Sequence, residues 1–215
     1  MTAVKKIRTQ RDLHIQRKIF HATSVLMIFM CLVLFSADVN WLLYAALGLP
    51  LVALDALRRS SESLNRFLIR WFSCILRKTE IRQMTGGSYA IIGIGISYFI
   101  FELPVCQLAV LFLAIGDPIA SLFGLIWGEK KILGEKSWVG SWAALFFCSL
   151  SAFFYFTYLY PNFSSPFLYS IIFGLTGAIA ELLPVGRLND NLTQPLISGL
   201  LMSLVVLLNQ GDFSW

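Results

Sequence analysis

Four groups of polar residues interrupt an otherwise apolar chain, and their residue types suit phosphate chemistry. The first group is QRKIFH, in which Arg17 and His21 are four residues apart and share one helix face, with Lys18 beside them. Cationic side chains neutralise phosphate charge, so these three residues are candidate nucleotide-binding residues. Basic residues at the mouth of an apolar helix also anchor lipid head groups, and this group alone leaves both roles open.

The second group, LAIGDPIASLFG, places Asp117 and Pro118 inside a long apolar run. Proline lacks a backbone N–H and disfavours helical geometry in the residue before it. We therefore predict that the run 105–127 is split, with one helix ending near residue 116 and a second beginning at Pro118. An acidic side chain at membrane depth is costly and marks a functional site by default, although Asp117 could simply cap the second helix.

The third group, GEKKILGEKSWVGS at 128–141, gathers lysines, glycines and hydroxyls in one short connection. Lysines supply positive charge, and glycines let a backbone approach a ligand closely. The order of these residues is not that of a P-loop, and a solvated connection is the alternative. The candidate phosphate-binding residues here are Lys130, Lys131, Lys136 and Ser137.

The fourth group, AIAELLPVGRLNDNLTQPLISG at 178–199, contains two acids and an amide close to a helix boundary. Oxygen ligands suit Mg²⁺, which commonly bridges a protein to substrate phosphates. Asp190 could instead cap the last helix. Together with the acid of the second group, the candidate metal ligands are Asp117, Glu181, Asp190 and Asn191.

Membrane-spanning helices must position these groups, because 57% of the 215 residues are hydrophobic, only 13% are charged, and the mean hydropathy is +0.73. A helix that crosses a bilayer needs about 20 mainly apolar residues. We therefore predict an all-α polytopic membrane protein with a single domain over residues 1–215 and about seven spans. The predicted spans are 19–35, 41–57, 86–101, 105–127, 139–160, 166–183 and 192–209.

The 17 Lys and Arg residues predict how the chain is oriented. They lie before the first predicted span and between the second and third, the fourth and fifth, and the sixth and seventh. Short loops rich in Lys and Arg stay on the cytoplasmic side. The N-terminus, with its basic segment 1–18, and all four polar groups are therefore predicted to be cytoplasmic. This asymmetry accounts for the net charge of +5, so we expect no nucleic acid partner.

The segment 62–78 has a pattern of its own. Phe67, Leu68 and Trp71 begin a run of apolar residues at helical spacing, while Arg66 and Arg70 fall on the opposite face. We predict an amphipathic helix that lies flat in the cytoplasmic interface, with packing against the other spans as the alternative. The four cysteines are scattered and indicate neither a zinc site nor a disulfide framework.

Taken in order, these motifs resemble those of the CTP-dependent lipid kinases, the group that includes dolichol kinase, phytol kinase and yeast-type diacylglycerol kinase. The resemblance covers residues 16–199, nearly the whole chain. The motifs that carry it are RKxxH at 17–21, TGGSYAIIG at 85–93, GDPIASLFG at 116–124, the lysine-rich loop at 128–141 and AELLPxxxxNDNLTxPLxSG at 180–199.

The resemblance implies a membrane-embedded kinase that moves the terminal phosphate of a nucleotide, commonly CTP, to the hydroxyl of a polyprenol, a shorter isoprenoid alcohol or diacylglycerol. It implies that the sensitive basic pair is Arg17 and Lys18, and that the acidic residue is Asp117, with Gly124 close behind. This chain has Pro118 where some relatives carry Thr or Ser.

Our working hypothesis distributes these residues over one cytoplasmic site. The phosphates would be bound by Arg17, Lys18, Lys131 and Lys136. Asp190 and Glu181 would hold Mg²⁺, the expected cofactor, and Asp117 would act as the base or as a second metal ligand.

Two other functions fit parts of the same pattern. A cytidylyltransferase that makes CDP-lipid from CTP and phosphatidate needs the same charges and Mg²⁺, but it releases pyrophosphate. A transporter also has a broken helix with a buried acid at mid-membrane. Transport is disfavoured because the acids gather on one side and the outer loops are nearly uncharged.

Overall fold

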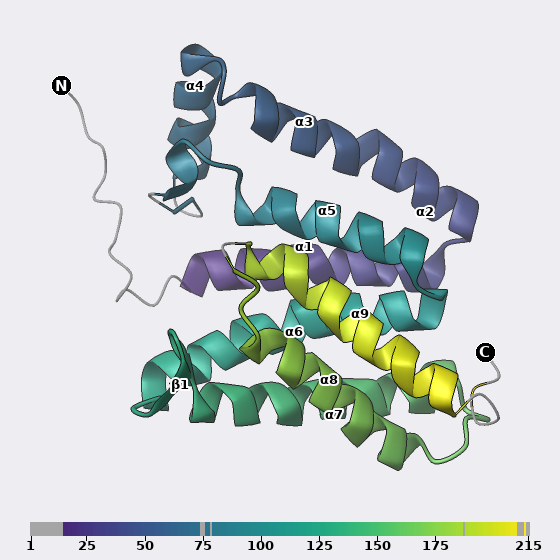
Figure 1. The fold of residues 1–215 in the computed structure, drawn as a ribbon. Helices are drawn as coiled ribbons and strands as arrows, with labels where there is room; N and C mark the ends of the chain where they lie inside the picture. Colours follow the sequence, from purple (N-terminus) through teal and green to yellow (C-terminus); the bar gives the residue numbers. More distant parts are fainter. Residues whose placement is uncertain (1–14, 74–75, 78, 187, 210–212, 214–215) are drawn as a thin grey trace.

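The computed structural model describes residues 15–73, 76–77, 79–186, 188–209 and 213. Most of the predicted basic segment 1–18 therefore lies outside the described residues. The described chain is a bundle of helices that run back and forth between two ends (Figure 1). This arrangement confirms the predicted all-α membrane fold in its main features.

The helices follow the predicted spans to within a few residues, because the length of each apolar run determines where a buried helix begins and ends. A short π-helix joins α2 to α3, so these elements form one run over Ala37–Leu57. The elements of the bundle are α1 (Ile15–Leu34), α2 (Ala37–Leu43), η1 (Tyr44–Gly48), α3 (Leu49–Leu57), α5 (Gly86–Ile100), α6 (Leu103–Trp127), α7 (Trp138–Leu159), α8 (Pro166–Leu182) and α9 (Asp190–Leu208).

Five of these described helical runs are long and apolar enough to cross a membrane. They are α1, the α2–α3 run, α6, α7 and α9. Helices α5 and α8 are apolar but shorter, with 15 and 17 residues. The predicted count of seven spans and the predicted cytoplasmic N-terminus stay predictions.

The prediction that the fourth apolar run is split was wrong. Helix α6 continues through Pro118 to Trp127, so Asp117 caps no helix. Pro118 removes only the hydrogen bond to the carbonyl of Ala114, and the neighbouring turns keep theirs. Helix α6 also packs closely against α7 at this point, because a Cβ atom at Gly116 would lie 2.8 Å from Cys148 Sγ. The broken helix that would have been typical of a transporter is therefore not found in α6.

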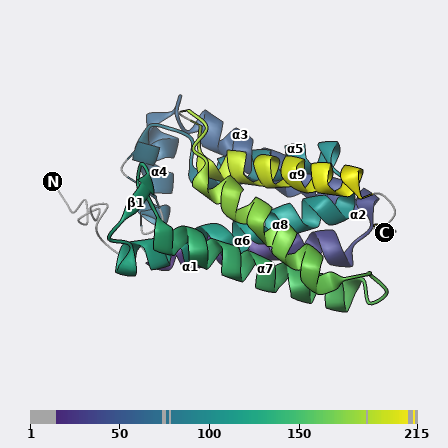
Figure 2. The ribbon, with the colours of Figure 1, turned by 60° about the horizontal axis from the view of Figure 1, so that its bottom comes forward.

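Small residues bring neighbouring helices into close contact, as is common in membrane bundles. A Cβ atom at Gly93 of α5 would lie 2.9 Å from the carbonyl oxygen of Leu192 in α9. Gly174 of α8 packs in the same way against Ser149 of α7. Figure 2 shows α9 lying along α5. The first turn of α9, which carries Asp190, is thereby fixed relative to α5.

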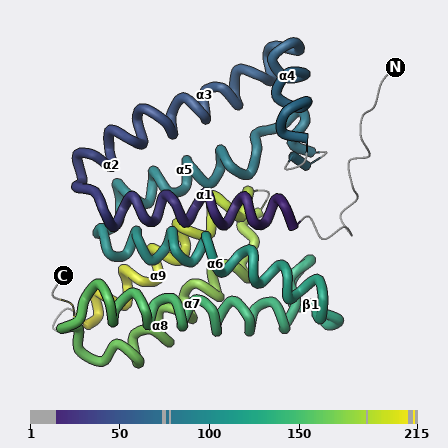
Figure 3. The backbone as a smooth tube through the Cα atoms, turned by 180° about the vertical axis from the view of Figure 1, so that it is seen from behind, coloured from purple at the N-terminus to yellow at the C-terminus, as the bar shows by residue number. Residues whose placement is uncertain are grey.

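Three of the four polar groups lie at one end of the bundle, and the second group lies within α6. The start of α1, the connection from α3 to α5, the connection from α6 to α7 and the start of α9 gather at the left in Figure 1, whereas the C-terminus lies at the right. Figure 3 shows the same division from behind. The back-and-forth path of the helices therefore brings residues far apart in sequence to a single end.

Two connections at this end differ from their predictions. The amphipathic helix α4 (Glu62–Phe72) is shorter than the predicted 62–78, and a 3₁₀ turn, η2 (Thr79–Ile81), follows it. Residues 74–75 and 78 of that prediction lie outside the described residues. The lysine-rich loop contains a small antiparallel hairpin of β1 (Lys131–Leu133) and β2 (Lys136–Ser137), which the all-α prediction missed. Gly134 permits this turn because its φ is +55°.

Candidate active site

Lys136 joins the hairpin to the last two helices. Its Nζ lies 2.7 Å from Glu181 Oε1 at the end of α8 and 3.1 Å from Asp190 Oδ2 at the start of α9. The Glu181 side chain is 3% exposed, whereas that of Asp190 is 45% exposed. Burial lowers the pKa of Lys136, but the carboxylates of Glu181, Asp117 and Asp190 raise it by more, so the net shift is upward. The three carboxylates therefore favour the charged form of Lys136.

Asp117 brings α6 into the same cluster. Its carboxylate interacts electrostatically with Lys136 and also with Lys18 on α1. Lys18, Asp117, Lys136, Glu181 and Asp190 therefore form one group, which we call the charged cluster. The structure thus brings together acids and cations from all four polar groups of the sequence.

Arg17 and His21 of the RKIFH motif have other surroundings than Lys18. Arg17 lies beside Glu80, with 3.8 Å between Nη2 and Oε1. The Nε2 atom of His21 is buried and has no hydrogen-bond partner among the described residues. Arg17 and His21 both line a cavity beside α1. Only Lys18 of this motif interacts with the charged cluster.

The remaining hairpin residues lie outside the charged cluster. Lys130 and Lys131 are exposed, and Lys131 Nζ donates to the Glu135 carbonyl at 2.9 Å. Ser137 is buried and caps α7 by accepting a hydrogen bond from Gly140 N at 3.2 Å. A Cβ atom at Gly124 would lie 2.8 Å from Ser137 Oγ. Gly124 and Ser137 therefore pack α6 against the start of α7.

The predicted magnesium ligands do not form a closed metal site. In the part of the chain that the structure describes, no group of three His, Cys, Asp or Glu side chains is arranged to hold a metal ion. The ammonium of Lys136 lies between Glu181 and Asp190. Asn191 is buried, and its Nδ2 donates to the Gly86 carbonyl at 2.9 Å. Of the four candidates, Asp117 and Asp190 remain the carboxylates that a metal bound to a nucleotide could approach.

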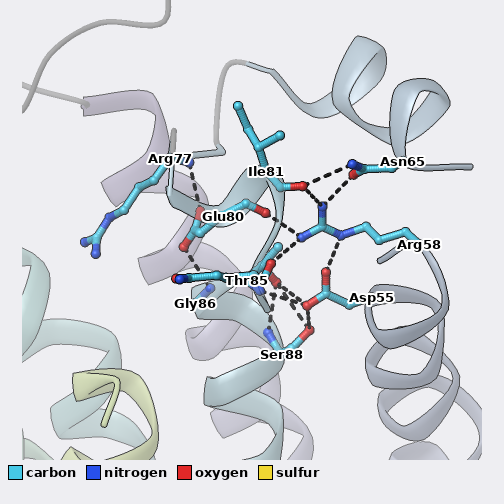
Figure 4. A network of polar contacts seen from close by, with 10 residues as sticks. Asp55, Arg58, Asn65, Arg77, Glu80, Ile81, Thr85, Gly86 and Ser88 are labelled. Atoms are coloured by element: carbon cyan, nitrogen blue, oxygen red, sulfur yellow. Dashed lines mark hydrogen bonds and ion pairs between the residues drawn. The ribbon is translucent and has the colours of Figure 1, made fainter. Parts of the chain in front are cut away.

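A buried polar network that the sequence analysis missed lies next to the charged cluster (Figure 4). Its centre is Arg58, which is 2% exposed and donates hydrogen bonds from all three guanidinium nitrogens. The signal in the sequence was the pair Asp55 and Arg58, two charges three residues apart at the end of an apolar run. The acceptors are the side chains of Asp55 and Asn65 and the carbonyls of Glu80, Ile81 and Gln83.

The network fixes the start of α5. Asp55 Oδ2 accepts hydrogen bonds from Thr85 N at 2.8 Å and from Ser88 Oγ at 2.6 Å. Glu80 Oε1 accepts from Gly86 N at 2.9 Å. Because Asn191 donates to the carbonyl of this same Gly86, the network also reaches the start of α9. The TGGS residues of the sequence motif therefore link two parts of the site.

An apolar cavity of about 600 Å³ opens beside this network. It lies between α1, the α2–α3 run and α5, with α4 contributing at the polar end. Its volume is in the range of small-molecule binding sites, roughly 300–1,000 Å³. The polar end of the bundle therefore holds both a charged cluster and the polar end of an apolar cavity.

Comparison with known proteins yields neither a matching family model nor a matching solved structure. It does yield CTP-dependent diacylglycerol kinase 1 of Saccharomyces cerevisiae, 26% identical over 89% of this chain and 73% of the yeast protein. The protein of the same name from Schizosaccharomyces pombe is 28% identical over 74% of this chain and 77% of its own length. The protein of that name from Eremothecium gossypii is 23% identical over 91% of this chain and 68% of its own length. The chain is thus similar over most of its length to CTP-dependent diacylglycerol kinases.

Similarity to these kinases confirms the resemblance seen in the sequence. The motifs that carry the resemblance begin α1, begin α5, lie within α6, form the hairpin and join α8 to α9. In this chain the motifs at α1, α5, the hairpin and the α8–α9 connection lie at the polar end of the bundle (Figure 1). The motif within α6 joins them through the interaction of Asp117 with Lys136. Motifs that are scattered along the sequence are thus parts of one region.

Proposed function

We propose that this protein is a membrane-embedded kinase that transfers the terminal phosphate of CTP to the hydroxyl of a membrane lipid. Diacylglycerol is the favoured acceptor, because three of the relatives are named as diacylglycerol kinases. The observation that carries the proposal is the convergence of Lys18, Asp117, Lys136, Glu181 and Asp190 beside an apolar cavity. Phosphoryl transfer depends on charge neutralisation and alignment, which such an arrangement supplies.

The charges in the cluster favour a metal-bound nucleotide over a free one. Three carboxylates, those of Asp117, Glu181 and Asp190, face two ammonium groups, those of Lys18 and Lys136. This excess of negative charge repels a free triphosphate. Asp117 and Asp190 are oxygen donors of the kind that Mg²⁺ prefers. Asp190 would hold Mg²⁺, with Asp117 as a second ligand or as the base, and the ion would supply positive charge that neutralises the transition state.

The remaining polar residues would hold the two substrates in place. Lys18 would bind the phosphates directly, and Arg17 would do so beside it. The exposed hairpin residues Lys130 and Lys131 would attract the nucleotide from solution. The pair of Lys136 and Glu181 would orient Asp190, which is the more exposed carboxylate. The polar end would face the cytoplasm, where CTP is available.

The proposed reaction is a displacement at the terminal phosphorus of CTP. The lipid hydroxyl oxygen attacks the terminal phosphorus, and the bond from that phosphorus to the bridging oxygen breaks. CDP leaves, and the hydroxyl proton passes to a base, for which Asp117 is the candidate. The products are CDP and a phosphorylated lipid.

Labelled CTP tests the proposal. Purified protein in detergent, with Mg²⁺, would be given CTP labelled at the α or the γ phosphate together with dioleoylglycerol, a polyprenol, phytol or phosphatidate. We expect the γ label, and not the α label, to enter the lipid fraction with dioleoylglycerol. ATP, GTP and UTP in parallel reactions measure the preference for the donor.

Two outcomes would overturn the proposal. Entry of the α label into lipid, with the γ label released as pyrophosphate, would identify a cytidylyltransferase. Absence of label from every lipid, with intact protein, would exclude kinase activity on these acceptors.

A further inference from the structure

The walls and the ends of the cavity beside α1 differ in chemistry. Apolar side chains line most of its length, among them Val25 and Ile28 of α1, Leu51 of α3, and Ile91 and Ile94 of α5. The elements that enclose it are apolar along most of their length and include two of the candidate membrane spans, α1 and the α2–α3 run. A hydrocarbon chain would therefore lie in surroundings that match it, whereas a water-soluble ligand would lose its hydration.

At the end far from the charged cluster, the polar groups are already satisfied. Asn40 Nδ2 donates to the Phe35 carbonyl at 3.0 Å, and Tyr98 Oη donates to the Ala37 carbonyl at 3.0 Å. These two hydrogen bonds need no ligand to complete them.

At the polar end, one buried atom is not satisfied. Four buried side-chain polar atoms in the described part of the chain have no hydrogen-bond partner, and of these only His21 Nε2 belongs to a residue that lines the cavity. A buried nitrogen without a partner costs free energy that a ligand hydroxyl could recover. The His21 ring therefore offers a hydrogen bond at the mouth of an apolar cavity.

The position of His21 also relates the cavity to the charged cluster. His21 follows Lys18 by three residues on α1, which is about 4.5 Å along the helix axis. Lys18 interacts with Asp117, so a hydroxyl held at His21 would lie close to the phosphates that the cluster would bind.

Helix α4 contributes two different apolar edges at this mouth. Leu68 and Phe72 line the cavity. Phe67 and Trp71 face outward and are 58% and 69% exposed. Such an arrangement suits a helix that covers the cavity mouth on one side and contacts the membrane interface on the other.

We propose that this cavity binds a hydrocarbon chain of the acceptor lipid and that His21 Nε2 hydrogen-bonds to its free hydroxyl. The proposal rests on the proposed kinase function and adds where the acceptor lies. It gives His21 to the acceptor, where the sequence had suggested the nucleotide. The occupant is a membrane lipid that carries an unmodified hydroxyl beside its chain, as diacylglycerol does.

Direct binding tests the proposal without relying on catalysis. Wild-type protein would be cross-linked to a diacylglycerol analogue that carries a diazirine on one acyl chain. We expect cross-links in α1, α3 and α5, competed at least tenfold better by dioleoylglycerol than by dioleoylphosphatidylcholine. His21→Ala should reduce that preference toward equal competition. Cross-links that both lipids compete equally would indicate an ordinary structural lipid, and cross-links elsewhere would exclude the cavity; either result overturns the proposal.

A matched pair of variants on α5 tests the cavity by kinetics. Ile91→Trp fills the cavity, whereas Ile96→Trp adds the same side chain at a position that does not line it and is 38% exposed. We expect Ile91→Trp to raise the KM for dioleoylglycerol at least tenfold with little change in the KM for CTP, and Ile96→Trp to change neither. Equal acceptor KM values for the two variants would overturn the proposal.

These experiments separate the two proposals. If wild-type protein cross-links in the cavity but phosphorylates no lipid, the kinase function fails and the binding site stands. If it phosphorylates diacylglycerol but cross-links elsewhere, only the cavity proposal fails.

Discussion

The buried ion pair between Lys136 and Glu181 makes a prediction about single residues. Lys136→Met would leave Glu181, whose side chain is 3% exposed, without its counter-charge. Removing one partner of a buried pair typically costs about 3–5 kcal/mol. We expect a loss of stability of this size, measured by thermal unfolding in detergent, and partial recovery in the double variant Lys136→Met, Glu181→Gln.

Lys131→Met is the matched control for that loss. Lys131 is exposed, and its ammonium bonds only to a backbone carbonyl of the same hairpin. Its replacement should change stability by less than about 0.5 kcal/mol. Equal melting temperatures for the two single variants would contradict the structural role of Lys136.

The charge of Asp117 makes a second prediction at this scale. Asp117→Asn keeps the shape of the side chain but removes its negative charge from the cluster with Lys18 and Lys136. We expect kinase turnover to fall about 100-fold or more, in line with the effect of removing a positioned acid or base. The control is Asp38→Asn, an exposed aspartate at the start of α2, at the other end of the bundle. Full turnover in Asp117→Asn would remove this residue from the mechanism.

At the scale of residues, the sequence predicted that charged side chains converge, but it did not predict their individual contacts. The types and order of Lys18, Asp117 and Asp190 were visible in the motifs. The sequence did not reveal that Lys136 turns toward α8 and α9 while Lys131 stays in solvent. That difference depends on the hairpin turn at Gly134, which carries no hydrophobic periodicity.

The next prediction concerns the stability of one element, the connection from α3 to α5. Arg58 holds this connection by donating to five acceptors. Arg58→Lys keeps the charge, but one ammonium cannot reproduce the planar set of donors. We expect a loss of about 2 kcal/mol in stability and faster proteolysis between α3 and α5. Arg66→Lys on exposed α4, where the pair with Glu62 is 68% and 84% exposed, should have no such effect.

The contact between α5 and α9 makes a further prediction. In Gly93→Ala the new Cβ atom would lie 2.9 Å from the Leu192 carbonyl oxygen and 3.0 Å from its Cα, and neither backbone atom can move easily. Overpacking of this kind costs about 1–3 kcal/mol and would shift the start of α9, which carries Asp190. We expect lower thermal stability together with lower turnover. In Gly87→Ala the nearest atom is 3.7 Å away, so its melting temperature should stay unchanged.

The hydrophobic runs of the sequence predicted where the long helices lie. The sequence did not predict correctly where a helix is interrupted or where it ends early. Pro118 suggested a break, but the effect of a proline depends on whether neighbouring helices hold the flanking turns, as Cys148 does at Gly116. The helical spacing after Phe72 likewise predicted a longer α4 than the structure shows. At Pro118 tertiary contacts, which one sequence does not display, decide the outcome.

For the whole molecule, the two shorter apolar helices of the bundle are the ones that carry polar residues of the site at one end. Helices α5 and α8 have 15 and 17 residues. At 1.5 Å per residue they are about 22 and 26 Å long, shorter than the roughly 30 Å of a bilayer core. The start of α5 carries the Thr85 and Gly86 region, and the end of α8 carries Glu181. If both helices cross the bilayer, we expect these polar groups to lie within it, near the depth of a lipid hydroxyl.

The orientation of the whole molecule gives the last prediction. The charged cluster can use CTP only if the polar end faces the cytoplasm, and the positions of Lys and Arg predict this side. In a background without native cysteines, Lys131→Cys and Asn162→Cys place exposed thiols in the α6–α7 and α7–α8 connections, at opposite ends of the bundle. A membrane-impermeant maleimide applied to intact bacterial cells should label the variant at 162 and not the variant at 131, and inside-out vesicles should give the reverse. The opposite pattern would place the charged cluster outside the cell, where it would have no supply of CTP, and would contradict the proposed reaction.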